Sequence, residues 1–593
     1  MKKTRSIAFL LSVVMLLSIF ALAGCAGKEQ TDPDGALNIN YWIPVGEDST
    51  YYLSYEDNPA VKYMERMEFN GRKIDLDFTI PISGSELDNF NTLLATDEYA
   101  DIMDMSFSNN SATEMYEDGI IWDLTPYIEK YMPNYMKILN NNPDIAPYTY
   151  AEVDGEKKIL SIHALSEEVL GNFMGFLYRR DWVAKYGTDP KTGKAFEYGF
   201  SDPNDKSTWY DNVVFPSGDV DPVYISDWEW MFDIFTKALA DLEVTDGYCL
   251  SLYYKGYNED GTLFNAFGGT SPMWYRDLNG NAAFAGDSEN MRTYLDCMNN
   301  WYQTGWVDKN FAEHTSDMAF AIDSEKVHTG KVGMWIGRRG ETGTQMDVGD
   351  KLTSGIVAYG ARQPINDVYG TEAVKNKTPY SMYQYSRLRG SIVITNKVAE
   401  EDLPTLLSFL DYLYTPEGGA LICLGLTKEQ FEETQDESYI KFGLTNGAYQ
   451  TEVQTDGSIK YIREESLRND NNLASAMAAK RITTGYYAKG FVPALNASYT
   501  QYAQNAMAQW DYYLNTGTPQ KAIQAQFSSE ESNTYNKVFS NIDTFMSTNI
   551  PKFIKGNLNA RDDKDWGDYV KMLNKYSPDK VTSIYQRLFA TFK

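Results

Sequence analysis

The sequence predicts an α/β fold with a mainly parallel sheet, because strand patterns and helix patterns alternate along its first hundred residues. Residues 37–43 (LNINYWI) and 74–80 (IDLDFTI) alternate apolar and polar side chains, the period of a half-buried strand, and 100–105 is a shorter candidate. Between them, residues 61–67 could form a helix and 85–96 carry apolar side chains at helical spacing. Such alternation is typical of parallel sheets with right-handed crossovers.

Helix patterns dominate the remainder of the chain. Residues 228–239 and 403–414 each carry an apolar stripe at helical spacing, and 391–395 (SIVIT) is a compact candidate for a buried strand. The last hundred residues are mostly helical in pattern, for example 502–513 and 535–553. The C-terminal part is therefore expected to be rich in helices.

Length and composition limit the function. The 593 residues, 43% of them hydrophobic, suffice for about two to four domains or one large two-lobed body. The net charge of −29 argues against binding to nucleic acid and against docking on anionic lipid. Three histidines (His163, His314 and His328) leave little room for a multi-histidine metal site, so no metal or other cofactor is expected.

The N-terminus carries the pattern of an export signal. Basic residues at its start precede an apolar run over 7–23, which ends in the sequence Leu-Ala-Gly before Cys25. This resembles the lipobox of bacterial lipoproteins, which implies that residues 1–24 are cleaved and that Cys25 carries the lipid. An ordinary signal or anchor helix with an incidental cysteine is the alternative. Residues 25–36 are then a polar tether, and the body is held on the extracytoplasmic face of the cell membrane.

Three further cysteines lie far apart in the body, at positions 249, 297 and 423. An oxidising compartment permits a disulfide, but neither the spacing nor the odd number specifies one. Buried free thiols are the expected state.

Motifs for common enzyme chemistry do not occur: the chain has no phosphate-binding loop, dinucleotide-binding turn, zinc-protease pair or nucleophile elbow. No catalytic residue is predicted. Paired carboxylates for glycoside hydrolysis stay possible, but 82 acidic residues make any chosen pair uninformative.

Aromatic and arginine side chains near expected strand ends and loops suit a different task. A flat ring covers the apolar face of a sugar while nearby polar groups bind its hydroxyls. Trp42 and the residues around Asp104 fall near the carboxyl ends of predicted strands, where ligands bind in parallel sheets. The other aromatic candidates are Trp274, Tyr275, Trp335, Tyr383 and Tyr385. For any one of them, packing in the core is the alternative.

Two arginine pairs could add an anion clamp, because guanidinium binds carboxylate in a bidentate manner. They are Arg338 with Arg339, and Arg387 with Arg389. An ordinary surface ion pair is the alternative for each.

Taken in order, several segments resemble the family 1 extracellular solute-binding proteins of ABC importers, in particular the large lipoprotein subgroup. They are 39–44 (INYWIP), 124–135 (LTPYIEKYMPNY), 178–187 (YRRDWVAKYG), 301–308 (WYQTGWVD), 329–334 (TGKVGM) and 553–556 (FIKG). Each motif is weak alone, but together they span nearly the whole mature chain. The loop over 188–223 lacks the calcium repeat that some alginate-binding relatives carry, so no calcium site is expected.

The resemblance implies two α/β lobes that close on a ligand in the cleft between them. It places lobe 1 at 37–162 plus 356–414 and lobe 2 at 163–355 plus 415–593. The crossings would fall near 161–168, 356–362 and 414–418.

The expected partners are an oligosaccharide and the transmembrane subunits of an ABC permease, with the membrane reached only through the lipid anchor and the protein a monomer. The ligand-binding candidates are Trp42, Asp104, Arg180, Trp274, Tyr275, Trp335, Arg338 and Tyr383. An oligopeptide-binding lipoprotein and a secreted carbohydrate-active enzyme are the alternative functions.

Overall fold

The computed structural model describes most of the chain after the N-terminal segment. The described residues are 35–46, 50–143, 145–168, 171–172, 174–196, 212–251, 263–313, 324–338, 356–381, 387–468, 470–496, 501–513 and 527–591. Cys25 and the expected signal peptide lie outside these ranges. Among the described residues no helix is both long enough and apolar enough to span a bilayer.

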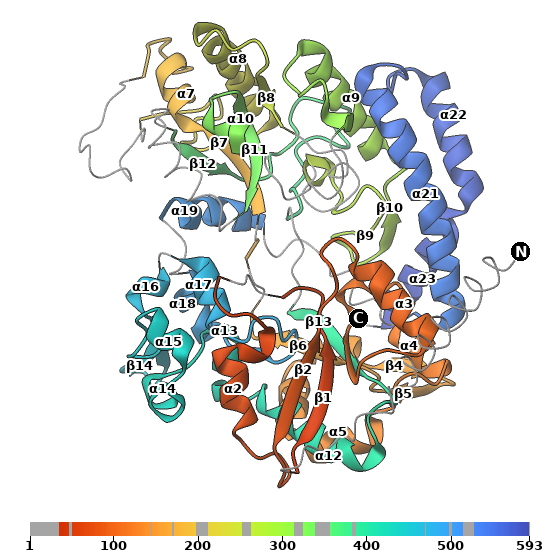
Figure 1. The fold of residues 1–593 in the computed structure, drawn as a ribbon. Helices are drawn as coiled ribbons and strands as arrows, with labels where there is room; N and C mark the ends of the chain where they lie inside the picture. The colour runs from red at the N-terminus through yellow and green to blue at the C-terminus, as the bar shows by residue number, and fades with distance from the viewer. Residues whose placement is uncertain are drawn as a thin grey trace, which may run out of the picture.

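The first lobe, in the lower half of Figure 1, is built on a six-stranded sheet in the order β16-β6-β13-β3-β1-β2. Its strands are β1 (Leu37–Trp42), β2 (Ile74–Thr79), β3 (Ile102–Asp104), β6 (Ile162–Ser166), β13 (Leu388–Ile394) and β16 (Tyr486–Tyr487). β13 runs antiparallel to β3 and β6, while the other pairings are parallel. The mainly parallel sheet that the sequence predicts is confirmed for this lobe.

Helices cover this sheet, and two hairpins attach to it. The helices are α2 (Pro59–Glu65), α3 (Glu86–Thr96), α4 (Ala112–Glu117), α5 (Thr125–Tyr131), α6 (Pro133–Asn141), α12 (Leu403–Tyr412), α13 (Pro416–Cys423), α14 (Lys428–Thr434), α15 (Glu437–Lys441), α16 (Glu465–Arg468), α17 (Asn471–Ala476) and α18 (Val492–Asn496). The 3₁₀ turns are η1 (Tyr55–Asp57), η2 (Met105–Phe107), η3 (Ala146–Thr149), η9 (Glu400–Asp402) and η10 (Lys489–Phe491). The hairpins are β4 (Ala151–Val153) with β5 (Glu156–Lys158), and β14 (Tyr449–Val453) with β15 (Ile459–Arg463).

Two carboxylates protect the outer edge of this sheet. β2 is an edge strand, and its free N–H groups would otherwise be open to pairing with another chain. Glu65 Oε1 accepts from the N–H of Leu76 at 2.9 Å, and Glu56 Oε1 accepts from the N–H of Phe78 at 2.8 Å. Burial raises the pKa of Glu65 from its ordinary value of 4.5 to about 7.

The second lobe, in the upper half of Figure 1, is built on a four-stranded sheet in the order β12-β7-β11-β8. Its strands are β7 (Met174–Arg179), β8 (Tyr248–Leu250), β11 (Val332–Arg338) and β12 (Ala358–Ala361). β7 is antiparallel to both neighbours, and β11 is parallel to β8. In each of these two sheets, therefore, one strand opposes the direction of the others.

Helices and a hairpin complete the second lobe, and three C-terminal helices lie against it. The helices are α7 (Arg180–Tyr186), α8 (Ile225–Asp241), α9 (Glu289–Thr304), α10 (Ser324–His328), α19 (Gln501–Trp510), α21 (Ser529–Lys555), α22 (Asp563–Leu573) and α23 (Pro578–Thr591). The hairpin is β9 (Trp274–Arg276) with β10 (Ala282–Phe284), and the 3₁₀ turns are η6 (Leu263–Phe267), η7 (Phe311–Glu313), η11 (Asp511–Tyr513) and η12 (Asn574–Tyr576). The Asn299 amide donates to the carbonyls of Phe553 and Ile554, which ties α21 to α9.

The chain passes between the lobes at positions that differ from two of the expected crossings. The strand pairing places the first crossing after β6, close to the expected range 161–168. The second was expected near 356–362, but the residues after β12 stay on the second lobe. There the N–H of Ile365 donates to the carbonyl of Val223 at 2.8 Å, and the N–H of Tyr380 donates to that of Asn265 at 3.1 Å. The second crossing therefore comes after residue 381.

The third crossing was expected near 414–418, yet residues up to 496 stay with the first lobe. The end of this stretch supplies β16, which pairs with β6 in the first sheet. The Asn58 amide also donates to the carbonyls of Ala476 and Ala478. The chain returns to the second lobe only with α19, which packs on β7 and β12. A two-residue strand such as β16 carries no period that a sequence reading could detect.

The three body cysteines, at positions 249, 297 and 423, are all buried and free. This confirms the expected state of the thiols. Burial raises the pKa of the Cys249 and Cys423 thiols to about 12.

Candidate functional site

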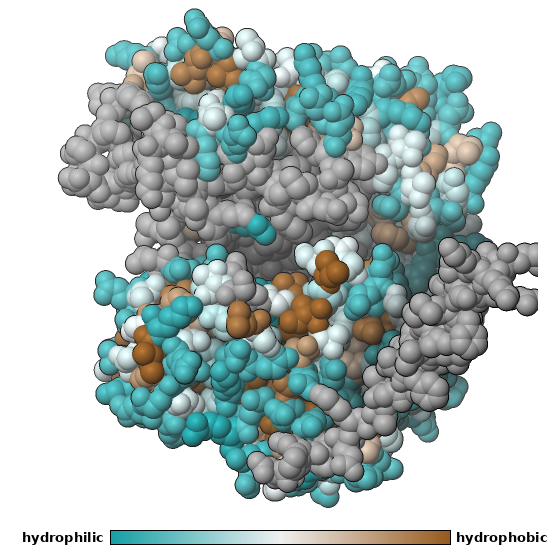
Figure 2. Space-filling view, in the orientation of Figure 1, coloured by the Kyte–Doolittle hydropathy of each residue, from teal (hydrophilic) through white to brown (hydrophobic). Residues whose placement is uncertain are grey.

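The strand directions place one edge of each sheet toward the opposite lobe. β3, β6 and β16 end, and the antiparallel β13 begins, at the edge of the first sheet from which the chain leaves for β7. At the facing edge of the second sheet β7 begins, while β11 and β12 end. Ligands of parallel sheets bind beyond the carboxyl ends of the strands. The candidate site is therefore the space between these two edges, and Figure 2 shows the surface hollowed between the lobes.

On the first lobe, this edge carries two aromatic rings and a guanidinium group. The Arg389 guanidinium lies 4.2 Å from the centre of the Tyr487 ring, within the range of a cation–π contact. Phe107, directly after β3, is 40% exposed. Ser106 lies beside the start of β13, since a Cβ atom at Gly390 would be 3.4 Å from its Oγ. This edge of the first sheet therefore has aromatic rings next to hydrogen-bonding groups.

Asp104 is fully buried behind this edge and stabilises it through two hydrogen bonds. Its Oδ1 accepts from the N–H of Ser106 at 2.6 Å, and its Oδ2 accepts from the hydroxyl of Thr483. These bonds hold η2, and with it Phe107, against the segment before β16. Asp104, which the sequence analysis named as a ligand-binding candidate, has its carboxylate directed to the protein in this structure.

Charged side chains continue the edge beyond β6 and β16. Lys489 forms an ion pair with Glu168, and its N–H donates to Glu167 Oε2 at 2.8 Å. Burial and the charge of Glu167 raise the pKa of Tyr486 to about 12. The Tyr486 phenol is therefore neutral at ordinary pH.

Fewer described residues lie at the facing edge of the second lobe than at that of the first. Arg338, at the end of β11, is exposed and pairs in register with Met174. Arg362, just after β12, donates to Gln509 Oε1 at 3.1 Å, and its guanidinium lies 4.2 Å from the centre of the ring of Tyr512, which is 59% exposed. The segments after β8 and β11, 252–262 and 339–355, lie outside the described residues, and Arg339 is among them.

The three tryptophan candidates are core residues in this structure. Trp42 is fully buried, meets Phe90 edge-on at 5.3 Å and donates to Asn89 Oδ1 at 2.8 Å. Trp335 is buried in a cluster with Trp510. Trp274 is buried, and its indole N–H lies 3.2 Å from the carbonyl oxygen of Pro578. None of these indoles presents an open face to the space between the lobes.

Arg180 and Tyr275 are also buried. Arg180 donates to the hydroxyl of Tyr178 at 2.9 Å and to the carbonyl of Val220 at 2.6 Å. The Tyr275 ring meets the ring of Tyr380 at 5.9 Å, beside the second crossing. Tyr383 and Tyr385 lie outside the described residues.

Sequence reasoning pointed to the residues around Asp104 without naming Phe107 or Ser106, and it missed Tyr487. Ser106 and Phe107 directly follow the candidate strand at 100–105, so the strand-end rule that selected Asp104 could have included them. Tyr487 offered no such signal, because β16 comprises only two residues. Arg387 and Arg389, named in the sequence analysis as a possible clamp, do lie at this edge.

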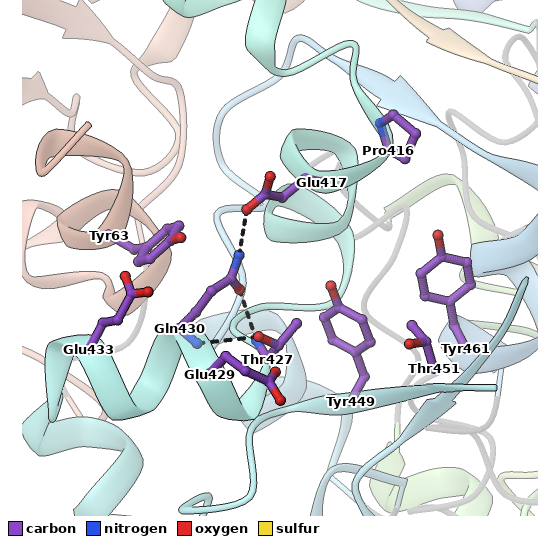
Figure 3. Close-up of a pocket in the computed structure, with 10 residues that line it drawn as sticks. All are labelled: Tyr63, Pro416, Glu417, Thr427, Glu429, Gln430, Glu433, Tyr449, Thr451 and Tyr461. Carbon is purple, nitrogen blue, oxygen red and sulfur yellow. Dashed lines mark hydrogen bonds between the residues drawn. The ribbon is translucent and has the colours of Figure 1, made fainter. Parts of the chain in front are cut away.

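A second concavity lies on the first lobe alone, with a volume of about 380 Å³ (Figure 3). It is lined by Tyr63, Pro416, Glu417, Thr427, Glu429, Gln430, Glu433, Tyr449, Thr451 and Tyr461. Gln430 Nε2 donates to Glu417 at 3.1 Å, and Gln430 and Thr427 bond reciprocally as the capping box that begins α14. These bonds serve the local fold, and no lining residue belongs to the second lobe.

No protein-family model matches the chain, and no curated protein matches it either. Solved structures do. The alginate-binding protein AlgQ2 without calcium ion is 15% identical, with a TM-score of 0.63 over 95% of this chain and 100% of that one. An extracellular solute-binding protein from Bifidobacterium longum subsp. infantis is 14% identical, with a TM-score of 0.63 over 95% and 99%.

The S. pneumoniae ABC-transporter substrate binding protein FusA, in complex with kestose, is 14% identical, with a TM-score of 0.61 over 94% of this chain and 99% of that one. Identities this low establish a shared architecture and no more. The chain has the two-lobed α/β fold of solute-binding proteins.

Proposed function

We propose that this protein captures an oligosaccharide between its two lobes outside the cytoplasm and delivers it to an ABC permease. The observation that carries the proposal is the facing pair of sheet edges, with Tyr487, Arg389 and Phe107 together on one of them. The solved structures of similar fold support it, since their names include an alginate-binding protein and a substrate-binding protein in complex with kestose.

The chemistry of the edge suits a polyol. An exposed ring such as Phe107 offers apolar surface to the C–H face of a sugar. Arg389 and Ser106 offer donors to the hydroxyl rim. Micromolar affinity corresponds to about −8 kcal/mol, which a few stacked rings and paired hydroxyls can supply. Binding requires no covalent step, so the ligand leaves unchanged.

The rest of the proposal comes from the N-terminal sequence. Cys25 after a cleaved signal would carry the lipid anchor, and residues 25–36 would tether the body at the outer face of the membrane. A monomer on such a tether can meet the transmembrane subunits of the permease directly. A closed, ligand-filled shape would distinguish the loaded protein from the empty one.

A glycan panel tests the proposal. The purified mature chain, without its lipid, is incubated with neutral and uronate-containing oligosaccharides while its melting temperature and the products are followed. One glycan class is expected to raise the melting temperature without being cleaved, since ligand that binds only the folded state stabilises it. Turnover of a glycan would instead indicate an enzyme. Stabilisation by peptides and by no glycan would indicate a peptide receptor.

A further inference from the structure

A buried amide, Asn172, occupies the end of the first crossing. Its side chain is fully buried, and Nδ2 donates to the carbonyl of Trp510 at 2.7 Å and to Asp511 Oδ1 at 3.0 Å. Its backbone N–H donates to the same Oδ1 at 2.6 Å. Trp510 and Asp511 end α19 and begin η11 on the second lobe. Asn172 therefore fixes the end of the first crossing to that lobe.

The same amide also binds the second crossing. Asn172 Oδ1 accepts from the hydroxyl of Ser381 at 3.2 Å, and the carbonyl of Ser381 accepts from the side-chain amide of Asn265 in η6. Ser381 and Asn265 are both buried. The two crossing segments are thus joined to each other at one point, and both are held by the second lobe.

Two glycines pack closely against this junction. A Cβ atom at Gly171 would lie 2.2 Å from Asp511 Oδ2, and one at Gly175 would lie 2.2 Å from Trp510 Cδ1. The Trp510 indole N–H donates to the carbonyl of Phe176 in β7 at 2.9 Å. Both glycines therefore allow the segment 510–511 to contact the backbone where β7 begins.

A second junction joins the crossings on the first lobe. The N–H of Ser166, at the end of β6, donates to the carbonyl of Arg387 at 2.7 Å, and Arg387 Nε donates back to the carbonyl of Ser166 at 3.2 Å. Arg387 also donates to Asn142 Oδ1. Only a few residues of each crossing separate this junction from that at Asn172.

We propose that Asn172 is a positioning residue that sets the axis about which the lobes close. Its bonds to Ser381 and Asp511 anchor the first and second crossings to the second lobe at one point, so that both segments leave that lobe together. Without the amide, the crossing segments lose a common anchor on the second lobe. The lobes then sample a wider range of angles, and a smaller fraction of them has the geometry that retains ligand. The effect on ligand retention rests on the proposed function, whereas the effect on lobe angles does not.

The test measures the interlobe distance without any sugar. Spin labels are attached to cysteines replacing Lys137 in α6 and Lys237 in α8, two exposed residues on different lobes, in the mature chain with Cys25 removed. Asn172→Ala is expected to broaden the distance distribution relative to the parent. Ser381→Ala removes one bond of the junction and should broaden the distance distribution less. This variant replaces Asn172→Ala in the test if Asn172→Ala does not fold.

The matched control is Asn299→Ala. The Asn299 amide also donates to two backbone carbonyls, but it joins α9 and α21, away from the crossings. This variant is expected to lower the melting temperature and to leave the interlobe distances unchanged. Distance distributions that are unchanged in both Asn172→Ala and Ser381→Ala would overturn the proposal.

A second readout applies once a ligand is known. Asn172→Ala is expected to accelerate ligand dissociation about 10-fold, the equivalent of one or two lost hydrogen bonds. Failure to find a ligand would count against the proposed function alone, because the sugar-free distances still test the junction.

Discussion

Arg389 and Tyr487 lie far apart in the sequence, yet the guanidinium of the first is 4.2 Å from the centre of the ring of the second. The contact exists because β13 begins, and β16 ends, on either side of β6. It fixes the ring and the donor at the edge that faces the second lobe. A flat, polar-edged surface of this kind is what a sugar ring requires.

Removing either member of this pair should weaken oligosaccharide binding. Arg389→Ala and Tyr487→Leu are each expected to raise Kd about 10-fold or more, the equivalent of one charged hydrogen bond or one stacked ring. Isothermal titration with the glycan that stabilises the parent chain measures the change. Lys130→Ala is the control, because Lys130 lies 4.6 Å from the ring of Tyr131 in a similar contact on α5. An equal loss in the control would exclude a local role for Arg389 and Tyr487.

Asp104 should affect both stability and affinity. Asp104→Ala leaves the N–H of Ser106 and the hydroxyl of Thr483 without their acceptor. The expected cost is about 1–3 kcal/mol in the free energy of unfolding, measured by urea denaturation. Affinity should also fall, because η2 would no longer be held beneath Phe107 and Ser106. An affinity that stays unchanged while stability falls would limit Asp104 to the fold.

Trp42 distinguishes a core role from a ligand-binding role. Its ring is fully buried against Phe90, so Trp42→Ala should cost about 3–5 kcal/mol in the free energy of unfolding. Trp42→Phe, which keeps an aromatic ring in the core, should retain most of the stability and the full affinity for glycan. A large loss of affinity in Trp42→Phe at nearly unchanged stability would restore the ligand-binding interpretation.

Glu65 makes stability depend on pH in an unusual direction. The folded state raises the pKa of Glu65 from 4.5 to about 7, chiefly through burial, so between these values it binds the proton more tightly than the unfolded chain does. The contribution of this group to stability is therefore complete below about pH 4.5 and is lost as the pH rises to about 7. Glu65→Gln keeps the acceptor for the N–H of Leu76 and should remove this dependence.

Urea denaturation of the parent and of Glu65→Gln at several pH values measures the difference between them. The free energy of unfolding of the variant should exceed that of the parent increasingly from pH 5 to pH 7. The exposed Glu68→Gln, nearby in the sequence, should follow the parent. Parallel curves for the parent and Glu65→Gln would show that the carboxyl titrates normally.

Much of the secondary structure could be predicted from the sequence. The alternation in residues 37–43 and 74–80 predicted β1 and β2, and the apolar stripe in 403–414 predicted α12. It could not show that helices cover both faces of the first sheet. Tyr41 and Trp42 point to opposite faces of β1, and each is buried in a different cluster. For this reason the prediction that Trp42, at a strand end, binds ligand does not agree with its burial in the core.

The features that the sequence could not predict depend on pairing between distant segments. The course of the chain between the lobes depends on contacts such as β16 with β6 and Asn172 with Ser381, which join distant segments and follow no period. Tyr487 reaches the site only through that pairing. Strand-end reasoning can locate the neighbourhood of a strand that leaves a sequence pattern, such as β3 before Phe107, but it misses residues brought in by a strand as short as β16.

Sugar capture between the lobes is tested most directly by the structure of the mature chain with a stabilising glycan bound. We expect a sugar ring between the lobes, within contact distance of Arg389, Tyr487 and Phe107, and with the lobes closed on it. A sugar bound in the groove of Figure 3, or lobes that stay apart around an empty cleft, would contradict it.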